Sequence, residues 1–327
     1  MSLPSSDSPT EQMAAAAPHD AEALAIRCRG LHKRFGETVA LQSVDLEVRR
    51  GECFGLLGPN GAGKTTTIEI LEGLQEADGG SVEVLGMRWD RDATAIRARL
   101  GVQLQESEFY DKGTVEETIR LFRSFYPRGP SVRDLLGFVQ LEEKRGAQIR
   151  NLSGGQRQRL SVACALAGSP DVLFLDEPTT GLDPQSRRQL WDVCEAFRAG
   201  GGTILLTTHF MDEAEHLSDR IAILDRGQVI AQGTPAELIR TLGGEHVVEF
   251  SSTAPIADDR LAALPGVTRV GRRGEHHLLT VNELHTSVPA LLALVTGAGG
   301  DLTGLATHHA TLDDVFLALT GRGLRDE

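Results

Sequence analysis

The stretch Gly58-Pro-Asn-Gly-Ala-Gly-Lys-Thr65 decides the fold of this chain, because it matches the phosphate-binding loop pattern G-x-x-x-x-G-K-[ST]. An apolar run typical of a strand, Cys53 to Leu57, comes before it. The residues after it, 66–73, indicate a helix that a glycine ends. This strand–loop–helix context distinguishes a phosphate loop from a chance glycine turn. We therefore expect an α/β fold, with a nucleotide at this loop.

The residue types in the loop suit a nucleoside triphosphate and Mg²⁺. Small residues let the backbone approach a phosphate, and the exposed N–H groups at a helix N-terminus attract its oxygens. Lys64 brings a positive charge to the β- and γ-phosphates, and Thr65 brings a hydroxyl to Mg²⁺. The nucleotide-binding residues predicted here are Gly58, Pro59, Asn60, Gly61, Ala62, Gly63, Lys64, Thr65 and Thr66.

Length and composition indicate a two-domain acidic protein. The chain has 327 residues, and 33 Lys and Arg against 46 Asp and Glu give a net charge of −13. This acidity disfavours nucleic acid as the main partner. The sequence has no apolar run of about 18 residues that could span a membrane and no early basic region of a signal peptide, so we expect a cytoplasmic protein. Residues 1–22 are rich in Ser, Pro, Ala and acids and are predicted to form a disordered tail.

Other segments give a coarse secondary structure. We expect helices over residues 92–100, from a capping box at Thr114 to about residue 167, and from Pro184 onward. Strands are expected over residues 101–105 and 203–206, with a hairpin at residues 225–227. A further capping box is predicted at Thr234.

Two acids follow another predicted strand. Val172 to Leu175 is a short apolar run, as in a strand buried on both faces, and Asp176 and Glu177 follow its last apolar residue. α/β folds place ligands at such strand ends. We predict that Asp176 holds Mg²⁺ and that Glu177 accepts a proton from the attacking water or orients it. By themselves, two acids at a strand end are more often only solvated, but the phosphate loop favours the functional interpretation.

The segment Asn151-Leu-Ser-Gly-Gly-Gln156 predicts a second anion-binding helix start. Ser153 followed by Gln156 is a capping-box pattern, and Gly154 and Gly155 leave the N–H groups of the first turn uncovered. The plain alternative is that these residues only cap a helix.

These motifs occur in the order found in ATP-binding cassette (ABC) transporter ATPases, and the chain resembles that family over residues 23–243. The resemblance implies a P-loop NTPase cassette with a mixed sheet core and a helical subdomain at about residues 108–167. It also implies a head-to-tail dimer of two copies. ATP would lie between the phosphate loop of one copy and Ser153, Gly154 and Gly155 of the other.

The resemblance implies four further roles. Gln105 matches a glutamine that contacts Mg²⁺ or water and borders the permease contact. Asp183 matches an aspartate that couples the two sites, and His209 matches a histidine that hydrogen-bonds the γ-phosphate. Phe35 matches an aromatic residue that stacks on adenine, where the family more often has Tyr; without the family it is a plausible core residue. The predicted catalytic residues are thus Glu177, His209 and Gln105, and the predicted Mg²⁺ ligands are Thr65, Gln105 and Asp176.

Residues 244–327 predict a small α+β accessory domain after the pair Gly243-Gly244. Its segments follow a β-α-β-β-α-β order, which is the ferredoxin-like pattern. The last segment, residues 311–321, predicts an amphipathic helix whose apolar face either closes this domain's own core or makes contacts elsewhere. This ending resembles the daunorubicin-type drug-export ATPases of the family.

We predict the ATP-hydrolysing motor subunit of an ABC exporter. It would drive a separate transmembrane permease for drug or other hydrophobic cargo, and the permease would hold it at the inner face of the cell membrane. One alternative is a soluble ABC ATPase that acts on nucleic acid or ribosomes, which a single acidic cassette disfavours. The other is a regulatory module, which the presence of Glu177 and His209 disfavours.

Overall fold

A six-stranded sheet carries the phosphate loop in the computed structural model, which describes residues 24–104 and 109–321. Its order is β5-β6-β7-β3-β8-β9, with the first five strands parallel and β9 antiparallel to β8. The strands β3, β6 and β7 are buried along their whole length, which explains their almost continuous apolar sequence. The bounds are β3 (Cys53–Leu57), β5 (Leu100–Gln103), β6 (Val172–Asp176), β7 (Thr203–Thr208), β8 (Arg220–Asp225) and β9 (Gln228–Gly233).

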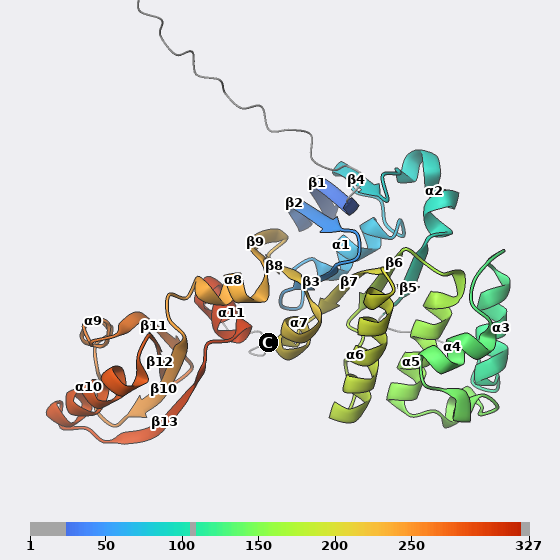
Figure 1. The fold of residues 1–327 in the computed structure, drawn as a ribbon. Coiled ribbons are helices and arrows are strands. Elements are labelled where there is room, and N and C mark those ends of the chain that lie inside the picture. Colours follow the sequence, from blue (N-terminus) through green and yellow to red (C-terminus); the bar gives the residue numbers. More distant parts are fainter. Residues whose placement is uncertain (1–23, 105–108, 322–327) are drawn as a thin grey trace, which may run out of the picture.

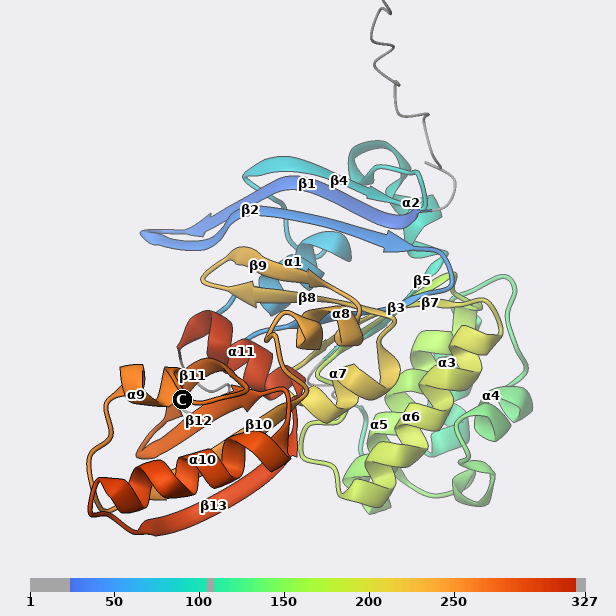
Figure 2. The same ribbon diagram turned by 60° about the vertical axis from the view of Figure 1, so that its left-hand side comes forward.

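A smaller antiparallel sheet covers one side of the central sheet. Its order is β2-β1-β4, with β1 (Leu24–Phe35), β2 (Thr38–Arg49) and β4 (Gly79–Val84). Helix α1 (Lys64–Leu71) lies between the two sheets (Figures 1 and 2). One buried cluster joins these layers, so the phosphate loop is placed on a packed support; it includes Ile26, Leu46, Phe54, Ile68 and Leu205.

A helical part lies beside the β5 side of the sheet (Figure 1). It contains α3 (Val115–Ser124), α4 (Val132–Phe138) and α5 (Gly154–Ala165). The capping boxes predicted at Thr114 and Ser153 start α3 and α5. The remaining helices of this half of the protein are α2 (Trp89–Arg97), α6 (Pro184–Ala199), α7 (Met211–Leu217) and α8 (Pro235–Arg240), and short 3-10 turns span Glu142–Lys144, Ile149–Asn151 and Leu166–Gly168.

The helix expected over residues 92–100 lies earlier in the chain. Helix α2 begins at Trp89 and ends at Arg97, and Leu100 already belongs to β5, where it pairs with Val172. The apolar side chain of Leu100 therefore serves the sheet rather than the helix. The capping box predicted at Thr234 starts α8, with Pro235 at its first position.

The C-terminal part has the ferredoxin-like order expected from the sequence. Its strands form an antiparallel sheet with the order β11-β12-β10-β13, and α9 and α10 connect them. A core of its own lies among these elements and includes Phe250, Leu261, Leu279 and Leu291. The elements are β10 (His246–Ser252), α9 (Asp258–Ala262), β11 (Val267–Arg273), β12 (His276–Val281), α10 (Leu284–Gly297) and β13 (Leu302–His309).

The last helix, α11 (Leu312–Thr320), joins the two parts of the protein. Its buried face, which includes Phe316, belongs to a cluster with Met211 of α7 and Leu238 of α8. The same cluster includes Val247 of β10. The backbone N–H of Leu312 also donates to Glu215 Oε1 of α7 at 2.8 Å. The apolar face of this helix thus packs on the cassette as well as on its own sheet (Figure 2).

We expect Phe316→Ala to lower the free energy of unfolding by about 3–5 kcal/mol, because Phe316 is fully buried in this shared cluster. Leu319→Ala on the same helix is the control, since Leu319 is 44% exposed and should cost less than about 1 kcal/mol. Urea unfolding of the two variants measures both values. Equal losses of unfolding free energy would contradict the cluster that α11 shares with the cassette.

Among the helices of residues 24–104 and 109–321, none is both long and apolar enough to cross a bilayer.

Candidate functional site

The phosphate loop lies between the end of β3 and the start of α1. Gly61 and Gly63 have φ values of 76° and 104°, in a backbone region that residues other than glycine rarely adopt. A Cβ at Gly63 would lie 2.6 Å from Leu41 Cδ2 and 2.8 Å from the Ala40 carbonyl oxygen. No side chain caps the start of α1, in contrast to α3 and α5. The first backbone N–H groups of α1 are therefore not occupied by a capping side chain. This is the arrangement that binds phosphate oxygens.

Lys64 is held by the loop itself. Its side chain is buried, and Nζ donates to the carbonyl oxygens of Gly58 at 2.8 Å and Pro59 at 3.2 Å. Nζ also lies 3.7 Å from Glu177 Oε1. Burial lowers the pKa of Lys64, while the carboxylates of Glu177 and Asp176 act to raise it. The Lys64 ammonium is thus held against the backbone of the phosphate loop.

The two predicted acids lie at the end of β6 and are tied to the neighbouring strand. The Thr207 hydroxyl of β7 donates to Asp176 Oδ1 and accepts from the Glu177 N–H at 3.0 Å. Asp176 is buried, and this burial raises its pKa. Glu177 adopts a left-handed backbone conformation with φ of 47°, so the chain turns sharply directly after Asp176. The two carboxylates therefore belong to different environments.

Glu177 lies between a lysine and a histidine. Its Oε2 is 3.3 Å from His209 Nδ1, and its Oε1 faces Lys64. The hydrogen bond with His209 is the largest cause that lowers the pKa of Glu177. A lowered pKa keeps the side chain as a carboxylate, which is the form that accepts a proton. Three adjacent parallel strands, β3, β6 and β7, bring these side chains to one edge of the sheet.

The oxygen donors at this edge fit Mg²⁺. A buried carboxylate such as Asp176 requires a positive or hydrogen-bonding partner, and hard oxygen ligands are those that Mg²⁺ prefers. Thr65 lies in the first turn of α1, after Lys64, and is exposed. Gln105, the third predicted ligand, lies outside the described residues.

The Ser153 segment forms the predicted capping box. Ser153 Oγ accepts from the Gln156 N–H at 3.2 Å, and Gln156 Oε1 accepts from the Ser153 N–H at 3.1 Å. Ser153 and Gly154 are exposed, whereas Gly155 is buried. A Cβ at Gly155 would lie 2.5 Å from Ser186 Cβ, so this glycine allows α5 to approach α6. Within the described residues, no hydrogen bond or ion pair joins this segment to the phosphate loop.

Two other predicted residues lie on exposed positions. Phe35 ends β1 and is 48% exposed, and Lys33 Nζ lies 5.4 Å from its ring centroid. The Phe35 ring is therefore accessible for stacking, and Phe35 is not a core residue. Asp183 caps α6, because its Oδ1 accepts from the N–H groups of Gln185 and Ser186 at 3.0 Å each. Within one chain, this carboxylate orders the start of α6.

Two residues near the site were not predicted. Thr207 holds both acids, and its only signal in the sequence is its position two residues before His209 at a strand end. Glu213 of α7 is fully buried, and its Oε1 accepts from Trp191 Nε1 at 3.1 Å. Burial raises the pKa of Glu213. The sequence offers no signal for this burial, because the partner comes from another helix.

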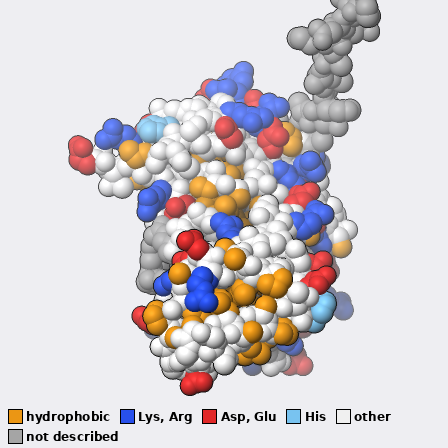
Figure 3. Space-filling model, turned by 90° about the vertical axis from the view of Figure 1, so that its left-hand side faces the viewer, with side chains coloured by type: hydrophobic (Ala, Val, Ile, Leu, Met, Phe, Trp, Pro, Cys, Tyr) orange, Lys and Arg blue, Asp and Glu red, His pale blue; other side chains and the backbone are white. Residues whose placement is uncertain are grey.

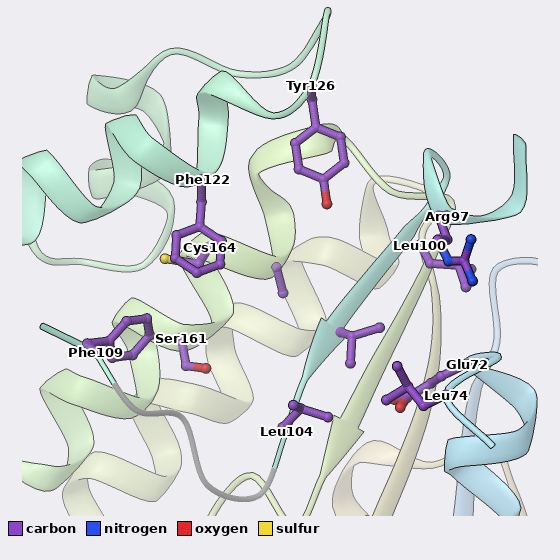
Figure 4. A pocket seen from close by; sticks show the side chains of 12 residues that line it. Glu72, Leu74, Arg97, Leu100, Leu104, Phe109, Phe122, Tyr126, Ser161 and Cys164 are labelled. Carbon is purple, nitrogen blue, oxygen red and sulfur yellow. The ribbon is translucent and has the colours of Figure 1, made fainter. Parts of the chain in front are cut away.

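A pocket of about 470 Å³ lies between the cassette sheet and the helical part. The segment after α1, the end of α2 and strand β5 form one wall, and α3 and α5 form the other (Figure 4). Leu104, next to the predicted Gln105, lines it.

Comparisons with known proteins agree with the geometry. The ABC transporter family matches residues 41–180. The Nod factor export ATP-binding protein I of Cupriavidus pinatubonensis is 42% identical over 307 residues, which cover 92% of each chain. The daunorubicin resistance ATP-binding protein DrrA3 of Streptomyces coeruleorubidus is 38% identical over 304 residues, covering 91% of this chain and 96% of that protein.

Solved structures are similar over about two thirds of the chain. A structure of the ATP-binding subunit of an ABC transporter has a TM-score of 0.61 and 30% identity, and the match covers 67% of this chain and 93% of that one. A dimeric ATP-binding cassette in a post-hydrolysis state, bound to ADP and Pi, has a TM-score of 0.59 and 26% identity, covering 64% of this chain and 98% of that one.

Proposed function

The chain belongs to the ATP-binding proteins of ABC transporters, and we propose that two copies of it enclose two Mg-ATP and drive a separate transmembrane permease. Its activity is ATP hydrolysis coupled to transport. One observation carries the proposal about the site: Glu177 lies 3.3 Å from His209 and 3.7 Å from Lys64 at the edge of the sheet. A carboxylate in this position can serve a water that attacks a phosphate bound by the loop.

Each residue at the edge has a proposed task. The N–H groups of the loop and the Lys64 ammonium bind the β- and γ-phosphates. Thr65, Asp176 and Gln105 would hold Mg²⁺, which supplies charge neutralisation for the phosphates. Glu177 takes a proton from the attacking water, and His209 hydrogen-bonds the γ-phosphate.

The second copy supplies the rest of the site in this proposal. The exposed start of α5, with Ser153 and Gly154, points its helix N-terminus at the phosphates of the partner's ATP. Asp183 lies at the start of the adjacent α6 and couples the two sites, and Phe35 stacks on adenine. We propose a division into residues 1–22, a cassette of residues 23–243 and an accessory domain of residues 244–327.

The partner in the membrane is proposed to contact the pocket beside Leu104. The names of the relatives concern Nod factor export and daunorubicin resistance, so we propose an exporter of hydrophobic or drug-like cargo. The chain would then lie on the inner face of the cell membrane, held there by the permease.

The accessory domain is proposed to act in assembly or regulation. Figure 3 shows hydrophobic side chains gathered on the face that this part of the protein presents. Exposed large hydrophobic residues of this part include Leu292 of α10 and Leu305 of β13. Its helix α11 also contacts α7, which directly follows the His209 segment, so movement of the domain can reach the site.

We expect membrane association to require the permease. The chain produced alone should remain in the soluble fraction, and it should move to the membrane fraction when its permease is produced with it. Fractionation followed by high-salt and carbonate washes measures this, with the permease alone as the reference. Retention through both washes without the permease would contradict the proposal.

A further inference from the structure

Glu72 is a buried acid at the pocket between the cassette sheet and the helical part. It directly follows the last residue of α1, and its side chain is only 3% exposed. Neither carboxylate oxygen has a hydrogen-bond partner among the residues that the structure describes. In Figure 4, Glu72 and Leu74 lie opposite Phe109 and Ser161 of the other wall.

An unpaired carboxylate in this position is unfavourable in three ways. Burial without a partner carries a desolvation cost, and this burial is the main reason why the pKa of Glu72 is raised to about 8. The nearby carboxylates of Asp176 and Glu69 raise the pKa further. Glu72 also caps the C-terminal end of α1, where the helix dipole adds partial negative charge. Burial therefore favours the neutral carboxyl group in the free chain, and a cation beside it would favour the carboxylate.

Among the described residues, no Lys or Arg forms an ion pair or a hydrogen bond with Glu72. Arg97 also lines the pocket, but its guanidinium lies over the Trp89 ring, 5.5 Å from the centroid, and the described residues include no ion pair between Arg97 and Glu72. The four residues that connect Leu104 to Phe109 in the sequence are Gln-Glu-Ser-Glu, without Lys or Arg. A cation for Glu72 is thus expected to come from another protein.

We propose that this pocket receives a segment of the membrane partner that carries one Lys or Arg among apolar side chains, and that Glu72 pairs with this cation. The inference rests on the proposed function, and it specifies the chemistry of the permease contact. The apolar lining, which includes Leu74, Leu104 and Phe122, suits the rest of the segment. Cytoplasmic loops of membrane proteins are rich in Lys and Arg, so such a residue is available on the correct side of the membrane.

The pairing also makes the contact selective. A segment with an acid at this position would repel the carboxylate, and a segment with an apolar residue would leave the buried carboxyl group without a hydrogen-bond partner, so both would bind more weakly. A basic residue removes that cost and gains a charge-assisted hydrogen bond.

The test measures binding to the purified permease. The probe is the membrane protein that co-purifies with the wild-type chain, reconstituted in nanodiscs, and the readout is its dissociation constant for each variant. We expect Glu72→Gln to weaken binding about tenfold or more, and Glu72→Lys to weaken it about a hundredfold or more. Glu76→Gln is the matched control, because it makes the same substitution at an exposed position and should bind like the wild type. ATP binding by each free variant confirms that it is folded.

A charge exchange identifies the partner residue. Each Lys and Arg in the cytoplasmic loops of the permease is changed to Glu, one at a time, and tested with the Glu72→Lys chain. We expect one of these permease variants to bind the Glu72→Lys chain at least tenfold more tightly than the unchanged permease does. Glu72→Gln that binds like the wild type, or the absence of any restoring combination, would overturn this inference and leave the proposed function intact. A wild-type chain that binds no membrane protein would instead overturn the proposed function, and the inference with it.

Discussion

Replacing Glu177 by glutamine is expected to lower ATP turnover by about 10²–10⁴-fold while ATP binding persists. Glutamine has nearly the shape of glutamate but cannot accept the proton of the attacking water. Glu177 is also the group that faces both His209 and Lys64, so no other carboxylate among the described residues has the same contacts. The residues that bind phosphate, Lys64 and the loop N–H groups, are unchanged in this variant.

Phosphate release measures the turnover, and size exclusion with ATP measures the dimer. Because ATP remains bound and uncleaved, we expect the Glu177→Gln chain to elute as a dimer with ATP. Glu143→Gln, an exposed change of the same kind, should keep wild-type activity. Full turnover by Glu177→Gln would disprove that Glu177 is the base.

Two mixtures of variants should differ strongly in activity if ATP is shared between two copies. Mixing a Ser153→Arg chain with a Lys64→Ala chain gives a heterodimer with one intact site and one site damaged twice. Mixing a chain that carries both changes with the wild type gives a heterodimer with two damaged sites. We expect the first heterodimer to be at least about tenfold more active, because removing one electrostatic contact in a catalytic site typically costs about 10²–10³-fold.

The comparison requires heterodimers that are purified through two different tags, since wild-type homodimers would hide the difference. ATP retained per dimer gives a second readout, with one nucleotide expected in the first heterodimer and none tightly held in the second. Homodimers of each single variant provide the background. Equal activity and equal retention in the two heterodimers would show that the start of α5 does not complete the partner's site.

Local chemistry allowed much of this protein to be predicted from its sequence. The capping boxes at Thr114, Ser153 and Thr234 all start helices, since the bonds involved join residues three apart. The phosphate loop could also be predicted, because its glycines supply the positive φ angles that the backbone of the loop requires. The β-α-β-β-α-β order of the C-terminal part also follows from patterns within single segments.

Contacts between distant segments could be decided only by the tertiary structure. The pattern of α11 shows one apolar face, but not that Phe316 would meet Met211 and Leu238 of the cassette. Likewise, Thr207 became a support for Asp176 only because β6 and β7 are neighbours in the sheet. Strand order depends on how the whole chain packs, which no local pattern contains.

The sequence by itself determined the chemistry that the site can perform, whereas the tertiary structure decided the environment of each group. Glu72 illustrates the difference. The sequence shows that Glu72 follows the helix after the phosphate loop. It does not show that Glu72 is buried at a pocket that α3, α5 and β5, far from it in sequence, also line. Burial and the pKa of a carboxyl group depend on all atoms around it, and these atoms are assembled only when the chain has folded.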